Sequence, residues 1–119
     1  INNLLISISS YDNGAPANIE NFQDVAKYWS DLKGYVLSLQ FSPTSPFRDN
    51  AVVEVDISDL KKALTLIGDA PVLANGSQNG IAAAGSASDA IYAYTGKLIE
   101  VRSILKDAYS FSDVNTLSW

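Results

Sequence analysis

The longest apolar repeat in the chain lies between Ser88 and Tyr109, and it constrains the fold more than any other feature. Its apolar side chains recur at alternating steps of three and four residues, at Ile91, Tyr94, Leu98, Val101, Leu105 and Ala108. This spacing places all of them on one face of an α-helix. At 1.5 Å per residue, such a helix is about 30 Å long. The segment therefore predicts a long C-terminal helix that begins after a cap at Ser86 or Ser88.

Gly96 leaves one alternative open within this segment. The Thr95-Gly96 pair is also suited to a turn, because glycine adopts backbone conformations that other residues avoid. Residues 90–94 and 97–103 would then form a hairpin in place of the helix.

The first 41 residues show two kinds of periodicity. In the segment Asn3–Ser9, Leu4, Ile6 and Ile8 alternate with Leu5, Ser7 and Ser9, which predicts a strand. A helix is expected from Asn18 to Lys33, on the apolar stripe Ile19, Phe22, Val25, Trp29 and Leu32, and it would end at Gly34. The alternation Tyr35, Leu37, Leu39 and Phe41 then predicts a second strand.

A competing interpretation continues the first long helix through Gly34. Phe22, Val25, Trp29, Leu32, Val36 and Leu39 fit a heptad spacing that ignores the glycine. Because a glycine inside a helix costs about 1 kcal/mol relative to alanine, and because Tyr and Phe favour strands, we expect the strand over 35–41.

The middle of the chain predicts a strand, a short helix and a loop. Residues 51–57 predict a strand, the best strand signal in the sequence, because Ala51, Val53, Val55 and Ile57 alternate with Val52, Glu54 and Asp56. A helix follows, capped by Asp56 or Ser58 and stopped by Gly68, on the stripe Leu60, Ala63, Leu64 and Ile67. Residues 71–74 suit a short edge strand, and the Gly-, Ser- and Ala-rich residues 75–88 suit a flexible internal loop.

Together these elements predict a single domain over residues 1–119 of the α+β class. The order strand, helix, strand, strand, helix is that of a split βαβ or ferredoxin-like antiparallel sheet, here with the added C-terminal helix. The alternative is a mostly helical bundle in which residues 19–40 and 88–109 form two long helices.

Composition removes several classes of function. The 119 residues contain no His, Cys or Met and carry a net charge of −5. Catalysis by a Ser-His or Cys-His pair, thiolate zinc sites and iron–sulfur clusters all need residues that are absent. Eight cationic side chains spread over the whole chain argue against nucleic-acid binding. No apolar run is long enough for a membrane span. Because the residues for these kinds of catalysis and metal binding are absent, we expect no cofactor, no metal and no enzyme activity.

Three features suggest where the protein could bind something. Glu54 and Asp56 share one face of the predicted strand and could bind a cation or act as acid and base, although helix capping and solvation explain them more simply. Tyr28 and Tyr92 lie beside the apolar stripes of their helices and suggest burial on a second side. Ile81 is the one large apolar residue of the loop 75–88 and could anchor a contact.

These features favour a structural or assembly subunit that binds copies of itself or another protein. A virion, pilus or injection-apparatus component fits the acidic, Met-free chain, with a secreted, periplasmic or virion location. One alternative is a small ligand-binding domain that uses a polar sheet face formed by Ser7, Ser9, Ser38, Gln40, Glu54 and Asp56. The other is a carboxylate-dependent hydrolase that uses Glu54 and Asp56.

Overall fold

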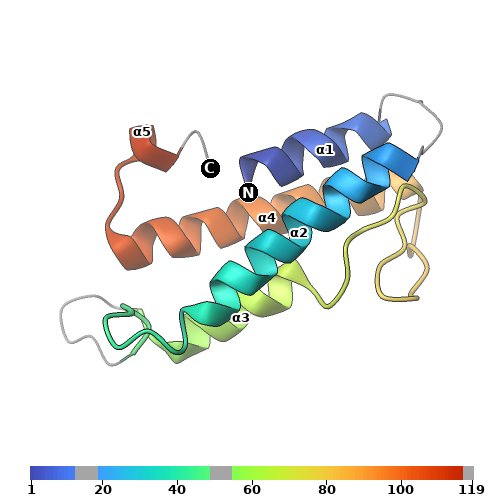
Figure 1. Ribbon diagram of the computed structural model, residues 1–119. Coiled ribbons are helices and arrows are strands. Elements are labelled where there is room, and N and C mark those ends of the chain that lie inside the picture. Colours follow the sequence, from blue (N-terminus) through green and yellow to red (C-terminus); the bar gives the residue numbers. More distant parts are fainter. Residues whose placement is uncertain (13–18, 49–54, 117–119) are drawn as a thin grey trace.

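Four helices of the described residues pack in a ring, shown in Figure 1. The computed structural model describes residues 1–12, 19–48 and 55–116. The helices are α1 (Asn2–Asp12), α2 (Ile19–Ser38), α3 (Ile57–Ile67), α4 (Ala87–Tyr109) and the single turn α5 (Asp113–Thr116). Each of the first four packs against two others, in the cyclic order α1, α2, α3, α4, so that the long helices α2 and α4 lie diagonally opposite each other.

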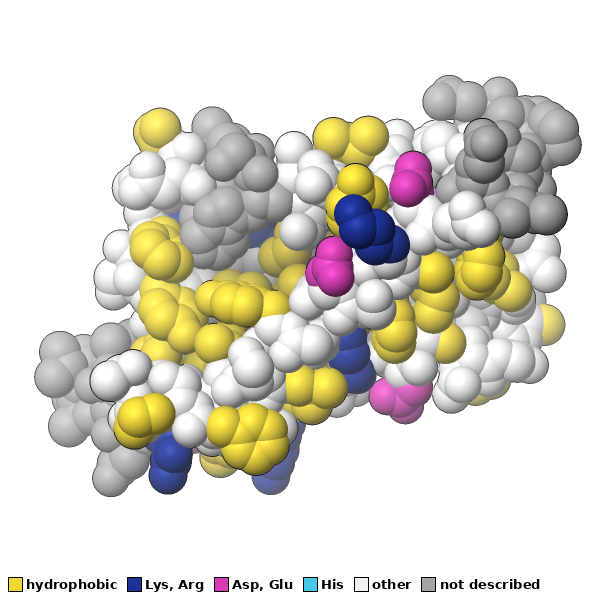
Figure 2. Space-filling view, viewed as in Figure 1, with side chains coloured by type: hydrophobic (Ala, Val, Ile, Leu, Met, Phe, Trp, Pro, Cys, Tyr) yellow, Lys and Arg dark blue, Asp and Glu magenta, His cyan; other side chains and the backbone are white. Residues whose placement is uncertain are grey.

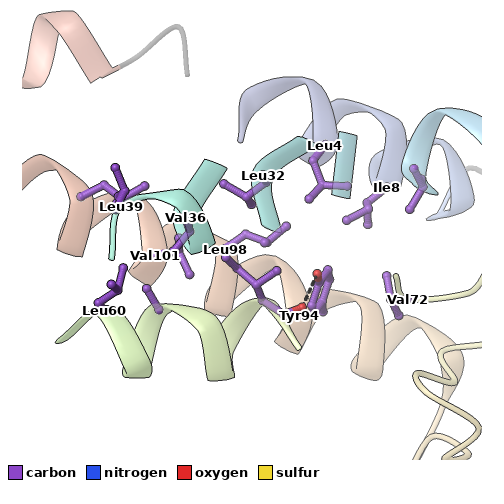
Figure 3. Close-up of a cluster of buried hydrophobic side chains, with 14 of the residues drawn as sticks. Leu4, Ile8, Leu32, Val36, Leu39, Leu60, Val72, Tyr94, Leu98 and Val101 are labelled. Carbon is purple, nitrogen blue, oxygen red and sulfur yellow. Dashed lines mark hydrogen bonds between the residues drawn. The ribbon is translucent and has the colours of Figure 1, made fainter. Parts of the chain in front are cut away.

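The predicted antiparallel sheet is wrong, and the alternative of a helical bundle is confirmed. The described residues contain only two isolated β-bridges, Val72 with Gln78 and Gln78 with Ile81. They contain no β-strand. Side chains from all four main helices join in one hydrophobic core, part of which is drawn in Figure 3. No helix of the described segments is both long and apolar enough to cross a membrane.

Residues 3–9 are helical because a second periodicity competes with the alternation. Leu4, Ile8 and Tyr11 stand at i, i+4 and i+7, and all three are buried, whereas Ile6 is 60% exposed. A short apolar run fits both periods, and the position of Tyr11 one turn further on favours the helix. The segment therefore packs as α1 against α2 and α4.

Residues 35–38 extend α2, so the heptad interpretation is confirmed and the strand over 35–41 is wrong. Val36 is fully buried in the core, and Leu39 is buried in the turn that follows α2. Burial of a Val or Leu side chain contributes about 1.5 to 3 kcal/mol. Since glycine inside the helix costs about 1 kcal/mol, burial outweighs the cost of Gly34.

Helix α3 has the predicted ends. Asp56 is its N-cap and Gly68 its C-cap, where the positive φ of 79° suits glycine. Of the strand predicted over 51–57, residues 51–54 lie outside the described segments, while Val55 and Asp56 are irregular and Ile57 already belongs to α3. The edge strand predicted for residues 71–74 is reduced to the single bridge at Val72.

Helix α4 confirms the long C-terminal helix and excludes the hairpin at Thr95-Gly96. It runs unbroken for 23 residues from the N-cap Ser86, whose hydroxyl accepts a hydrogen bond from the Asp89 backbone N–H. Every residue of the predicted seam is buried: Ile91, Tyr94, Leu98, Val101, Leu105 and Ala108.

The last carbonyls of α3 are bonded by side chains from three other parts of the chain. The Ile67 carbonyl accepts from the Tyr94 hydroxyl of α4 at 2.9 Å, drawn in Figure 3, from Trp29 Nε1 of α2 at 3.2 Å and from Gln78 Nε2 at 3.3 Å. Lys33 Nζ of α2 donates to the carbonyls of Leu64 at 3.1 Å and Gly68 at 2.6 Å. Carbonyls that a helix end leaves without a partner are satisfied here by tertiary contacts.

The loop between α3 and α4 contains a tight turn. Gln78 and Ile81 exchange two backbone hydrogen bonds of 3.0 Å around Asn79 and Gly80, which have φ values of 52° and 75°. Positive φ at both central residues defines a type I′ turn, and Asn-Gly is its preferred sequence. The flexibility of residues 75–88 stays a prediction.

Replacing Gly34 by Ala is expected to stabilise the protein by about 0.5 to 1 kcal/mol, because an exposed helix interior favours alanine. A Cβ at this position meets no atom within 4 Å. The matched control is Gly68→Ala, which should destabilise, since φ is positive and the new Cβ would lie 2.5 Å from Gln78 Nε2. Urea unfolding measures both. A loss of stability in Gly34→Ala would contradict a continuous α2.

Stability is also expected to depend on pH through Tyr94. Burial raises the pKa of this hydroxyl above its ordinary value of 10. Because the folded state holds the proton more tightly than the unfolded state, the stability from Tyr94 is present below about pH 10 and lost above it. Urea unfolding between pH 7 and 11 should show this loss in the wild type and a smaller loss in Tyr94→Phe. Tyr92→Phe, at an exposed ring, is the control and should follow the wild type.

Candidate functional site

An open apolar groove lies between the C-terminal halves of α2 and α4. It has a volume of about 420 Å³, and its lining comprises Ile1, Leu32, Tyr35, Leu105, Tyr109 and Phe111. Hydrophobic side chains gather in this hollow on the left of the face shown in Figure 2. Helix α1 has 11 residues whereas α2 and α4 have 20 and 23, so α1 covers only part of the surface between the two long helices.

Aromatic contacts fix one wall of the groove. The Tyr109 ring meets Phe47 edge-on at a centroid distance of 6.4 Å and stacks on Phe111 at 5.6 Å. Burial raises the pKa of Tyr109, with Tyr35 adding to the rise and a hydrogen bond to Ser45 opposing it. The Tyr109 hydroxyl is therefore neutral at pH 7, and this wall presents uncharged aromatic surface.

The chain after α4 is held beside the groove. Ser110 adopts the left-handed conformation as the C-cap of α4, and its N–H returns to the Asp107 carbonyl at 3.2 Å. Lys106 on α4 pairs with Asp113 on α5 at 2.5 Å. These contacts bring Phe111 onto Tyr109 and place α5 at the same end of the molecule.

A second hollow continues the groove along α2. It has a volume of about 290 Å³, shares Ile1, Leu32 and Tyr35 with the first, and adds Asn3, Tyr28 and Asp31. Tyr28, Leu32 and Tyr35 stand at i, i+4 and i+7 and so share one face of α2. The predicted site residue Tyr28 thus lines the second hollow, and the Lys27 ammonium lies 4.8 Å from the centre of its ring.

Tyr92 and Ile81 are placed elsewhere. Tyr92 is 81% exposed on the outward face of α4, away from the buried seam. Ile81 is 72% exposed and completes the type I′ turn. Neither residue lines the groove.

Asp56 serves as a helix cap. Its carboxylate accepts hydrogen bonds from the backbone N–H and the hydroxyl of Ser58, while Asp59 accepts from the Asp56 N–H at 3.0 Å. These bonds, the one from the Ser58 hydroxyl first, lower the pKa of Asp56 and keep it ionised. Its predicted partner Glu54 lies outside the described residues, so the carboxylate pair stays a prediction. Within residues 1–12, 19–48 and 55–116, no group of three acidic side chains could hold a metal ion.

Sequence reasoning missed Tyr35, Tyr109 and Phe111 as groove residues. The strand predicted over 35–41 includes Tyr35, although this residue repeats the position of Tyr28 two helical turns later. That spacing is the signal that the heptad interpretation of α2 would have supplied. Nothing in the sequence indicates that α1 leaves these side chains uncovered.

The chain matches no protein-family model, no curated protein and no solved structure.

Proposed function

We propose that the protein is a non-catalytic assembly subunit that pairs with a second copy of itself through the outward face of α4. The supporting observation is an exposed, uncharged stripe on that helix. It consists of Tyr92, Gly96, Ile99 and Ser103, and is called the outer stripe below. Tyr92 is 81% and Ile99 is 52% exposed. Large apolar side chains left exposed two turns apart on one face of a helix are typical of surfaces that bind another protein.

The outer stripe is complementary to itself. Tyr92 and Ile99 are seven residues apart, and the point midway between them falls at Thr95 and Gly96. If two α4 helices pack antiparallel about a two-fold axis at that point, each Tyr92 lies opposite Ile99 of the other copy. Such an isologous contact uses the same patch twice. Gly96, which has no neighbour within 4 Å of its Cβ position, lets the two backbones approach at the centre.

The two alternative functions have less support than this proposal. A ligand-binding polar sheet face loses its basis, because Ser7 and Ser9 lie on α1 and Ser38 ends α2. A hydrolase built on Glu54 and Asp56 gains no support, because the Asp56 carboxylate is engaged as the α3 cap. A virion, pilus or injection apparatus is the proposed setting, and only the acidic, Met-free composition supports it.

Light scattering during size-exclusion chromatography, over a series of micromolar concentrations, tests the proposal. The wild type should form a dimer, and Tyr92→Ser combined with Ile99→Ser should weaken it at least about tenfold, equivalent to about 1.4 kcal/mol of binding free energy. Ile6→Ser, which removes a similarly exposed side chain from α1, is the matched control and should leave the dimer unchanged. A monomer at every concentration, or equal weakening by the control, would refute pairing through the outer stripe.

A further inference from the structure

A positively charged side chain without an ion-pair partner lies beside the apolar groove. Arg102 stands three residues before Leu105 and seven before Tyr109, and both of these residues line the groove. This spacing places the three side chains on one face of α4. Ile1 also lines the groove, and its amino group has a lowered pKa because of burial first and the positive charge of Arg102 second. Arg102 therefore lies at the end of the groove that Ile1 forms.

The guanidinium of Arg102 lacks an acceptor for its hydrogen bonds. Its Nε is buried and has no hydrogen-bond partner. The ion pairs within residues 1–12, 19–48 and 55–116 use Lys33, Lys62 and Lys106, and none of them includes Arg102. A buried donor without an acceptor destabilises the protein, most of all when it is charged. A carboxylate supplies the missing acceptor, because its two oxygens match the planar donors of a guanidinium.

We propose that the groove binds an aliphatic carboxylate, with the hydrocarbon chain between α2 and α4 and the carboxylate on Arg102. The lining described above consists of three aliphatic and three aromatic side chains. Such a surface gains free energy when it is removed from water together with an apolar chain. The volume of about 420 Å³ lies within the range of small-molecule sites, which combine a mostly apolar wall with few polar groups.

The charges around the groove favour an anionic ligand in this orientation. A neutral ligand leaves Arg102 without a partner, and a cationic ligand is repelled by it. The second hollow, which shares Ile1, Leu32 and Tyr35 with the groove, contains the acidic side chain of Asp31 and so disfavours the carboxylate. The head group is therefore expected at Arg102 on α4 and the chain along the groove. The inference is independent of pairing through the outer stripe, whose residues do not line the groove.

Calorimetric titration with octanoate, and with octanol as the uncharged analogue, tests the proposal. Octanoate should bind the wild type at a single site and several-fold more tightly than octanol does. Arg102→Gln should weaken octanoate binding at least about tenfold, equivalent to about 1.4 kcal/mol, and leave octanol binding unchanged. Tyr35→Ser, which alters the wall of the groove, should weaken both ligands. Circular dichroism shows whether each variant keeps its helices.

Lys97→Gln is the matched control, because it removes an exposed cation of α4 that lines a different hollow. Octanoate binding should be unchanged in this variant. Absence of octanoate binding to the wild type would overturn the proposal and leave the groove to another occupant. Equal loss in Arg102→Gln and Lys97→Gln would also overturn it, since the anion would then respond only to net charge. Should Arg102→Gln fail to fold, equal affinity of the wild type for octanoate and octanol gives the contradicting result. A monomeric protein that binds octanoate would refute the α4 dimer and support this inference.

Discussion

The carbonyl groups at the end of α3 link the parts of the molecule. The Ile67 carbonyl receives hydrogen bonds from α2, α4 and the loop between α3 and α4, and Lys33 bonds the carbonyls of Leu64 and Gly68. A buried carbonyl without a donor costs about 1 to 3 kcal/mol, so these elements stabilise one another only when they are docked together. This constraint sets α3 between the two long helices, and the groove and the outer stripe follow from how those helices are placed.

The sequence correctly predicted α3 and α4, where the capping residues and the apolar spacing indicate the same helix. Every seam residue of α4 is buried, and α3 begins and ends at its capping residues, because capping and 3.6-residue periodicity are local properties. It failed for α1 and for the end of α2, where short apolar runs fit both a strand and a helix. There the outcome was decided by burial of Leu4, Ile8 and Val36 against distant helices. The bundle was foreseen only as the alternative, since its evidence lay in the heptad that crosses Gly34.

The surfaces were predictable only in part. Tyr28 and Tyr92 could be identified because each lies beside an apolar stripe. The structure places Tyr28 in the second hollow, next to the groove, and leaves Tyr92 exposed on α4. The groove itself could not be identified. It exists because α1 is shorter than α2 and α4, and because Phe111 folds back onto Tyr109. Both depend on how segments of the chain pack in three dimensions, which local sequence patterns do not indicate.

The mutual dependence of the contacts at Ile67 is tested most directly by urea unfolding of Trp29→Phe, Tyr94→Phe and Gln78→Leu, singly and together. Each single variant leaves two other donors on the Ile67 carbonyl and should lose about 1 kcal/mol. The triple variant leaves that carbonyl with none of the three. Its loss should exceed the sum of the single losses by at least about 1 kcal/mol, as expected for residues that share one partner. Additive losses would contradict the account, because the three donors would then act independently.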